Sequence, residues 1–146
     1  PELIRVDADT LRIYFVAKGD HTESALSADE GMTWIREGEI VIQDLSPGQW
    51  VVDPDLMALD DGQFRLFFAT PPDGVAGLSN KRIKSALSSD GRTFVLEAGD
   101  RVGVENAQQD LVDPDVVRLA EGSYRMYFGK VEGAGSTYDL KSAVHP

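Results

Sequence analysis

The sequence predicts an all-β protein built from repeated sheets, and three observations support this. A fifteen-residue phrase occurs three times, starting at Pro1, Pro54 and Pro114, so the repeat lengths are 53 and 60 residues. No stretch of about ten residues or more shows sustained helical spacing. Short runs of branched and aromatic residues recur instead, with turn residues between them. A repeat of this length is typical of a propeller blade or a solenoid unit.

Each copy of the phrase is predicted to form a β-hairpin. The second copy, residues 54–68, has two apolar runs around a turn that contains Gly62, and the third, residues 114–128, repeats this around Gly122. A tight hairpin turn requires positive φ at such a place, which glycine adopts without strain. In the first copy Asp9 holds the place, and Asp visits the left-handed region more readily than most residues.

A third and a fourth strand are predicted to follow each hairpin. In the first unit they are residues 23–27 and 35–42, with a bulge at Gly38. In the second unit they are residues 83–88 and 93–97. Four strands complete one unit, and such a four-stranded sheet, repeated at this interval, is typical of a β-propeller of antiparallel blades.

The chain is therefore predicted to be a single propeller segment, residues 1–146. Its blade repeats are residues 1–53, 54–113 and 114–146, and the last repeat is incomplete because it stops before a fourth strand. Propellers close with about four to eight blades. The sequence thus accounts for roughly two and a half to three blades of a larger ring.

Composition limits the classes of partner. The chain carries 25 acidic and 14 basic residues, a net charge of −11, and the acidic residues are scattered along it. Such a surface repels phosphate backbones and anionic lipids, so we expect neither nucleic acid nor a membrane as a partner. There is no cysteine, which removes disulfides and thiolate metal sites. Neutral ligands and proteins remain.

Several motifs together resemble one enzyme family. The chain contains Asp-Pro-Asp before an apolar strand, then Asp-Gly, then Tyr-Arg-Met-Tyr-Phe at residues 124–128, and later Ser-x-Asp-Gly-x-x-Phe at residues 88–94. This pattern resembles the repeats of five-bladed propeller glycosidases of the arabinanase, levansucrase and invertase type. The resemblance covers nearly the whole chain and about half of such a propeller. It implies a function on carbohydrate, and it favours a secreted or periplasmic protein.

A second motif resembles the Asp-box turn of sialidase-like propellers. Residues 27–34 read Ser-x-Asp-x-Gly-x-x-Trp, and residues 88–94 are a version shortened by one residue. We expect the Asp side chain to accept hydrogen bonds from turn amides, the glycine to take the strained position and the aromatic residue to pack beneath. These roles are structural, and the resemblance places the motif on the outer part of a blade.

Asp53 and Asp113 are the candidate catalytic residues. Each precedes Pro-Asp where a blade's innermost strand begins. Glycoside hydrolysis uses two carboxyl groups, about 5 Å apart for retention and roughly 6.5–9.5 Å apart for inversion. The resemblance implies two Asp and one Glu from separate blades, and Glu105 is the candidate for the acid. The alternative is structural, because an Asp before Pro is held extended and its carboxylate can accept turn amides.

Candidate substrate-binding residues are Trp50, Arg65 and Arg125. Arg12, Arg65 and Arg125 hold one position in the three hairpins, where a guanidinium could bind a carboxylate of the substrate. Threefold repetition favours the alternative of a blade-to-blade ion pair, for example with the Asp of Asp-Pro-Asp. Trp50 precedes Asp53 by three residues, so it is either a platform for a sugar ring or a buried anchor.

No cofactor is expected, although a structural calcium site built from Asp100, Glu105 and Asp110 is an alternative. His21 and His145 have no partner at metal-ligand spacing, so no metal site is assigned to them.

Two functions remain open. The first is a glycoside hydrolase-like module that acts on or binds carbohydrate at the axial face, with a catalytic set that looks incomplete on its own. The second is a non-catalytic propeller module for glycan or protein binding and self-assembly. An arc of three blades leaves apolar faces and open edges in water, so we expect a homodimer that completes a propeller.

Overall fold

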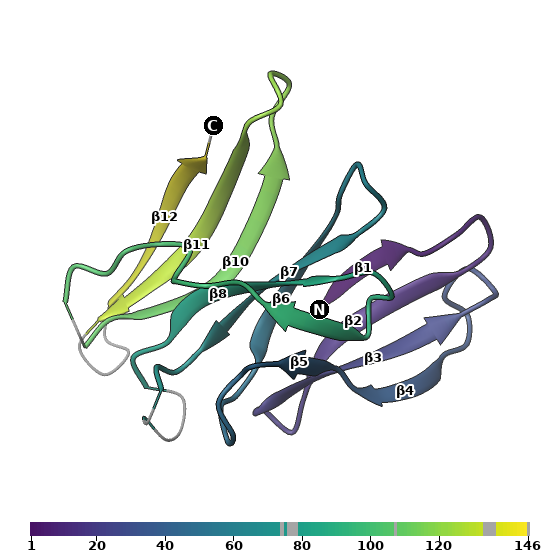
Figure 1. The fold of residues 1–146 in the computed structure, drawn as a ribbon, viewed down its shortest axis with the longest axis horizontal. Coiled ribbons are helices and arrows are strands. Elements are labelled where there is room, and N and C mark those ends of the chain that lie inside the picture. The colour runs from purple at the N-terminus through teal and green to yellow at the C-terminus, as the bar shows by residue number, and fades with distance from the viewer. Residues whose placement is uncertain (74, 76–78, 107, 133–136, 146) are drawn as a thin grey trace.

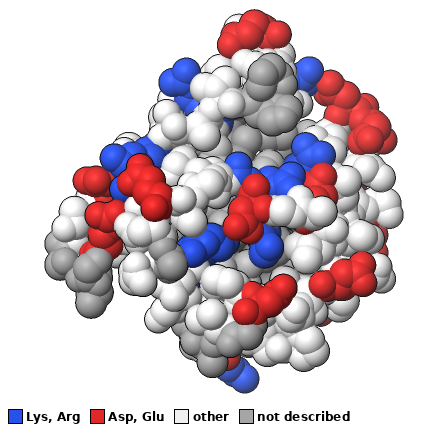
Figure 2. All heavy atoms as spheres, turned by 60° about the vertical axis from the view of Figure 1, so that its left-hand side comes forward, with Lys and Arg blue, Asp and Glu red and all other residues white. Residues whose placement is uncertain are grey.

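The computed structural model describes residues 1–73, 75, 79–106, 108–132 and 137–145, and within them it contains strands and no helix. The strands form three sheets that stand side by side like the segments of a fan (Figure 1). No helix in the described part is long and apolar enough to cross a membrane. Figure 2 shows acidic side chains spread over one face of the molecule, with several basic side chains around a hollow near its middle.

The three sheets follow one another along the chain. The first sheet contains β1 (Glu2–Arg5), β2 (Leu11–Ala17), β3 (His21–Ser27) and β4 (Ile35–Glu39). The second contains β6 (Val52–Ala58), β7 (Phe64–Thr70), β8 (Arg82–Ser88) and β9 (Thr93–Leu96), with β5 (Val41–Gln43) at its outer edge. The third contains β10 (Asp110–Arg118), β11 (Tyr124–Glu132) and β12 (Thr137–His145).

The predicted fourth strand of the first unit is wrong at its end. The bulge at Gly38 is present, with φ of 85° and a register shift in the pairing of β3 with β4. The strand stops at Glu39, however, and β5 pairs in parallel with β9, so that Ile42 lies opposite Phe94. The side chain of Ile40 is buried in the core between the first two sheets. The chain crosses from the first sheet to the second at this residue.

The hairpin turns follow the prediction in two of the three copies. Gly62 and Gly122 have φ of 82° and 90°. Asp9 does not adopt a positive φ, so that expectation is wrong. Its turn is held differently, because the backbone N–H of Asp9 donates to the carboxylate of Asp7 at 3.0 Å. A side chain that accepts from an amide two residues further on replaces the left-handed residue.

Two apolar cores hold neighbouring sheets together. The core between the first and second sheets contains Tyr14, Ile40, Val51, Leu56, Leu66, Phe68, Ala86 and Phe94. The core around the second and third sheets contains Phe67, Ile83, Leu111, Met126 and Phe128. Each sheet therefore buries its face against the next one, which is the packing of propeller blades.

The predicted hydrogen bonds of the two Asp turns at residues 27–34 and 88–94 are present, and Phe94 is buried, whereas Trp34 is exposed rather than buried beneath its turn. Asp29 accepts from the N–H of Thr33 at 2.8 Å, and Asp90 accepts from the N–H of Thr93 at 2.8 Å. Gly91 has φ of 71°, and its carbonyl accepts from the hydroxyl of Tyr14 at 2.8 Å. The second of these turns thus also fastens the second sheet to the first.

Candidate functional site

Asp53 and Asp113 both lie at an interruption of the sheet. The pairing of β6 with β7 shifts register between Val52 and Asp55, and the pairing of β10 with β11 shifts at the equivalent place. The two aspartates have φ of 54° and 50°, so the expectation that they are held extended is wrong. A left-handed backbone at a residue other than glycine is uncommon and costs about 1–3 kcal/mol. Both copies of the repeat therefore hold this aspartate in the same left-handed backbone conformation.

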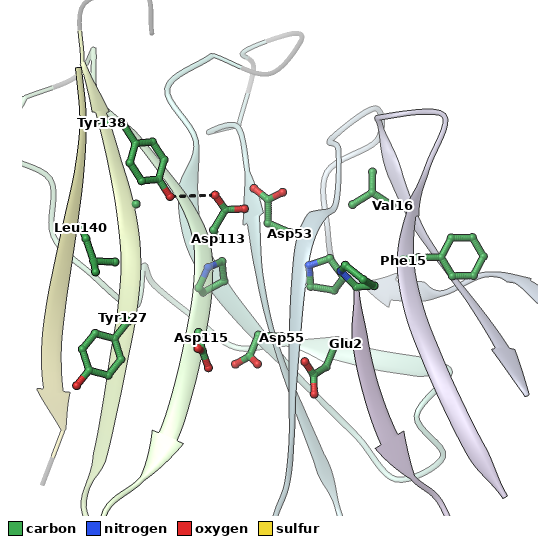
Figure 3. Close-up of a pocket in the computed structure, with 14 residues that line it drawn as sticks. Glu2, Phe15, Val16, Asp53, Asp55, Asp113, Asp115, Tyr127, Tyr138 and Leu140 are labelled. Atoms are coloured by element: carbon green, nitrogen blue, oxygen red, sulfur yellow. Dashed lines mark hydrogen bonds between the residues drawn. The ribbon is translucent and has the colours of Figure 1, made fainter. Parts of the chain in front are cut away.

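A cavity of about 800 Å³ lies where the innermost strands of the three sheets converge. It is lined by Pro1, Glu2, Phe15, Val16, Asp53, Pro54, Asp55, Asp113, Pro114, Asp115, Tyr127, Gly129, Tyr138 and Leu140. The side chains of Asp53 and Asp113 lie beside each other in this cavity, one from β6 and one from β10 (Figure 3). The structure therefore brings the two predicted aspartates together.

Burial and mutual repulsion act on Asp53. Its pKa is raised above the ordinary value, first by burial and then by the negative charge of Asp113. The backbone N–H of Asp113 and the charge of Lys81 act in the opposite direction. A pair of neighbouring carboxyl groups with one raised pKa is an arrangement that can hold and exchange a proton.

The second aspartate of the motif fastens one sheet to the next. The Asp55 carboxylate accepts from the backbone N–H of Val116 at 3.0 Å, which joins the second sheet to the third. Burial raises its pKa to about 7, and Glu2 and Asp115 add to the effect. These three carboxylates form a row in Figure 3 below Asp53 and Asp113. Asp55 is thus tied to the backbone of a neighbouring sheet.

Tyr138 is a residue of the cavity that the sequence analysis missed. Its hydroxyl lies 3.1 Å from the Asp113 carboxylate, to which it donates a hydrogen bond (Figure 3). Tyr127 and Leu140 stand on the same side of the cavity. The repeat gives no signal for this residue, because the corresponding position in the second unit, just before β8, is Lys81.

Glu105 and Trp50 are not among the residues that line the cavity. Glu105 lies in the loop before β10, and its carboxylate pairs with Lys130 at 2.5 Å. Trp50 lies two residues before the start of β6 and is half-buried. Their assignment as acid and as sugar platform stays a prediction.

The alternative of a calcium site at Asp100, Glu105 and Asp110 is not supported by the geometry. Asp100 pairs with Lys84 at 3.1 Å and Asp110 lies 3.6 Å from Lys81, so each carboxylate has a different lysine partner. Among the described residues no group of His, Cys, Asp and Glu could hold a metal ion.

Arg12 and Arg65 each pair with a glutamate of their own repeat unit, which corrects the predicted partner. Arg12 pairs with Glu37 at 2.9 Å, and Arg65 pairs with Glu97 at 3.0 Å, rather than with Asp-Pro-Asp. Arg12 also donates to the carbonyl of Asp90 in the next sheet at 2.8 Å. Arg125 forms no ion pair in the described part of the chain, and its Nε atom, like that of Arg65, is buried without a well-aligned hydrogen bond there.

Comparison with known proteins bears on the fold. No protein-family model matches the sequence, and no curated protein matches it. Among solved structures, an endo-1,4-beta-xylanase from Bacteroides thetaiotaomicron matches 99% of this chain and 45% of its own length, with a TM-score of 0.70 and 17% identity. An alpha-L-arabinanase from Penicillium chrysogenum, complexed with arabinobiose, matches 93% of this chain and 41% of its own, with a TM-score of 0.65 and 19% identity.

A GH43_1 enzyme from Xanthomonas citri, complexed with xylose, matches all of this chain and 50% of its own, with a TM-score of 0.68 and 17% identity. The chain thus spans about half the length of the structures that it matches. The predicted fold class is confirmed: the protein has an all-β propeller fold of the kind seen in five-bladed glycosidases, and covers about half of one. At these identities the likeness establishes the fold.

Proposed function

We propose that the protein is a carbohydrate-acting propeller module of the glycoside hydrolase type, which binds sugar in the cavity where the three sheets converge. The observation that carries this proposal is the pairing of Asp53 and Asp113 in that cavity, each on a strained backbone at the same place of its repeat. Strain repeated at a cavity is typical of a functional site. The fold is that of enzymes whose structures hold arabinobiose or xylose.

The chemistry of the two carboxyl groups fits this role. Carboxylates accept hydrogen bonds from sugar hydroxyls, and Asp53, with its raised pKa, can hold a proton near neutral pH more readily than an ordinary aspartate. Tyr127 and Tyr138 supply aromatic surface in the same cavity, and a sugar ring can stack on it. Glycoside cleavage needs one such group as an acid or base and another as its counterpart.

The test has a binding part and a turnover part. Isothermal titration with arabinobiose and with xylotriose should show binding by the wild-type chain, and Asp53→Asn and Asp113→Asn should each weaken it by about tenfold or more, as expected for loss of charged hydrogen bonds. Asp60→Asn is the matched control, because Asp60 is exposed and pairs with Arg118 outside the cavity. Equal affinities for the wild type and both cavity variants would contradict the proposal.

Turnover distinguishes the two functions left open by the sequence. An enzyme hydrolyses a panel of aryl glycosides, and Asp53→Asn or Asp113→Asn abolishes the activity. A non-catalytic module binds the same sugars without releasing the aryl group. One observation supports this second function: Glu105, the glutamate considered as the acid, pairs with Lys130 and does not line the cavity.

We further propose that two copies associate through the open faces of their outer sheets. Tyr127 in the third sheet is exposed, although its repeat equivalents Tyr14 and Phe67 are buried by the following sheet. At the other end, Leu3 in the first sheet is 52% exposed, whereas its equivalent Leu56 is 6% exposed. The third sheet and the first sheet thus each have a face that no neighbouring sheet covers. The first sheet of a second copy can therefore pack on the third sheet of this one.

Light scattering at micromolar concentration should therefore give the mass of a dimer. Leu3→Asp places a charge in the proposed interface and outside the cavity, and should shift the mass to that of a monomer. Asp60→Asn serves again as the surface control. A folded wild-type monomer would contradict the self-association while leaving the carbohydrate proposal untouched.

A further inference from the structure

The contact between Tyr138 and Asp113 depends on a glycine. Gly129 on β11 lies opposite Leu140 on β12, beside the ring of Tyr138. A Cβ atom at position 129 would lie 2.5 Å from Cζ of Tyr138 and 2.8 Å from Cε2, closer than real Cβ atoms approach other groups. The ring of Tyr138 therefore occupies space on β11 that a side chain at position 129 would fill. In this orientation its hydroxyl lies 3.1 Å from the Asp113 carboxylate.

The equivalent places of the second sheet are different. Ala69 holds the position of Gly129, and Lys81 holds the position of Tyr138. Lys81 acts on Asp53 through its charge, while its Nζ lies 3.6 Å from Asp110. The two aspartates share backbone geometry, then, but the repeat gives one a hydroxyl donor and the other a nearby cation. This asymmetry is what a pair of carboxyl groups needs for two separate roles.

We propose that Tyr138, seated over Gly129, is the positioning residue of Asp113 in the carbohydrate site. Its hydroxyl donates to the Asp113 carboxylate and fixes the rotamer in which that carboxylate lies beside Asp53 (Figure 3). This inference rests on the function proposed above as far as the sugar is concerned, whereas the hydrogen bond and its dependence on glycine do not.

The first test follows the ionisation of Tyr138 and needs no sugar. Burial, the hydrogen bond to Asp113 and the charge of Asp53 raise the pKa of Tyr138. Titration of the protein labelled with ¹³C at tyrosine Cζ should show this pKa falling toward its ordinary value in Asp113→Asn, because the charged acceptor is removed. Gly129→Ala should cause a fall as well, because it displaces the ring from Asp113.

Asp115→Asn is the matched control for this titration. Asp115 lines the same cavity from the same strand, yet it makes no hydrogen bond to Tyr138. An unchanged Tyr138 titration in both Asp113→Asn and Gly129→Ala would overturn the proposal. The displaced atoms belong to the end of a side chain rather than to backbone, so we expect Gly129→Ala to fold.

The second test uses arabinobiose and xylotriose as probes. Tyr138→Phe and Gly129→Ala should each weaken binding by about tenfold, and the double variant by no more than either single one, because both remove the same hydrogen bond. Tyr124→Phe, on the same strand as Gly129 but outside the cavity, should bind like the wild type.

The outcomes separate the two proposals. Sugar binding that is equal in the wild type, Tyr138→Phe and Gly129→Ala overturns the role of Tyr138 and leaves the carbohydrate function standing. A wild-type chain that binds no sugar overturns the carbohydrate function, and the Tyr138 titration then decides by itself whether the tyrosine holds Asp113.

Discussion

The second and third sheets carry the same phrase in different surroundings. Phe67 and Tyr127 occupy one repeat position, yet Phe67 is 7% exposed and Tyr127 is 38% exposed. Arg65 forms an ion pair with Glu97, with 3.0 Å between Nε and Oε2, whereas Arg125 forms no ion pair with another described residue. The burial and the ion pairing of a repeated residue therefore depend on the neighbouring sheet and on the fourth strand of its own sheet. Matched substitutions in the two sheets test this directly.

The largest difference is expected for the aromatic pair. Phe67→Ala should lower the free energy of unfolding by about 3–5 kcal/mol, because it empties part of the core between the second and third sheets. Tyr127→Ala should cost less than about 1 kcal/mol in a monomeric sample, since its side chain is already partly in water. Urea unfolding measures both values. Equal losses would show that the third sheet is covered in solution.

The aspartates that follow the prolines should differ in their dependence on pH. Folding raises the pKa of Asp55 from 3.8 to about 7, so between these values the unfolded chain has lost a proton that the folded protein retains. The free energy of unfolding contributed by this group is therefore greatest below about pH 4 and falls by roughly 3 kcal/mol as the pH rises to 7.

Asp55→Asn should remove most of this slope, whereas Asp115→Asn, at the exposed equivalent position, should reduce it only slightly, because burial contributes more to the pKa of Asp55 than the charge of Asp115 does. The measurement is urea unfolding at several pH values between 4 and 8. A slope that survives Asp55→Asn would assign the effect to another carboxyl group, and Asp53 is then the next candidate because its pKa is raised as well.

The repeated arginines should show a smaller difference. Arg65→Met leaves the partly buried Glu97 without its cation and should cost about 1–3 kcal/mol. Arg125→Met removes a guanidinium that, unlike that of Arg65, forms no ion pair among the described residues, so its effect should lie within about 0.5 kcal/mol. Thermal unfolding of the two variants side by side measures the contrast. A large loss in Arg125→Met would reveal a partner for this side chain.

The hairpin turns should show no difference at all. Gly62 and Gly122 both have positive φ, and nothing lies within 4 Å of a Cβ added at either place. Alanine at either position should therefore cost about 1 kcal/mol from backbone strain alone. Unequal losses in thermal unfolding would mean that one turn has a contact that the other lacks.

The fold could be predicted from the sequence because the repeat supplies independent evidence at each copy. The hairpins, Gly62, Gly122 and the Asp-Gly turns follow from residues whose backbone preferences are local. The end of β4 and the pairing of β5 could not be predicted, because no turn residue divides residues 39–42, and the division depends on where Ile40 packs. Local pattern does not say which sheet an edge strand joins.

The candidate site also contains residues that could be predicted from the sequence and residues that could not. Asp53 and Asp113 were found because they repeat, and a repeat places equivalent residues around one axis. Their left-handed backbone was not predicted, because a proline that follows favours an extended residue. Tyr138 was missed because it does not repeat. The partners of Arg12 and Arg65 were missed because glutamates at unequal spacing, Glu37 and Glu97, meet them only across the folded sheet.

The strand β5 has a consequence for how the molecule comes apart. It leaves the first sheet and adds itself to the edge of the second, where Val41 also donates to the carbonyl of Arg92 at 3.0 Å. Separating the first two sheets breaks the hydrogen bonds between β5 and β9 as well as the apolar core between the sheets. We therefore expect these two sheets to unfold as one cooperative unit. Residues 97–109, which lead to the third sheet, form no strand in their described part. We therefore expect the amide protons of β10 to β12 to exchange with solvent through unfolding of the third sheet alone, while the first two sheets stay folded.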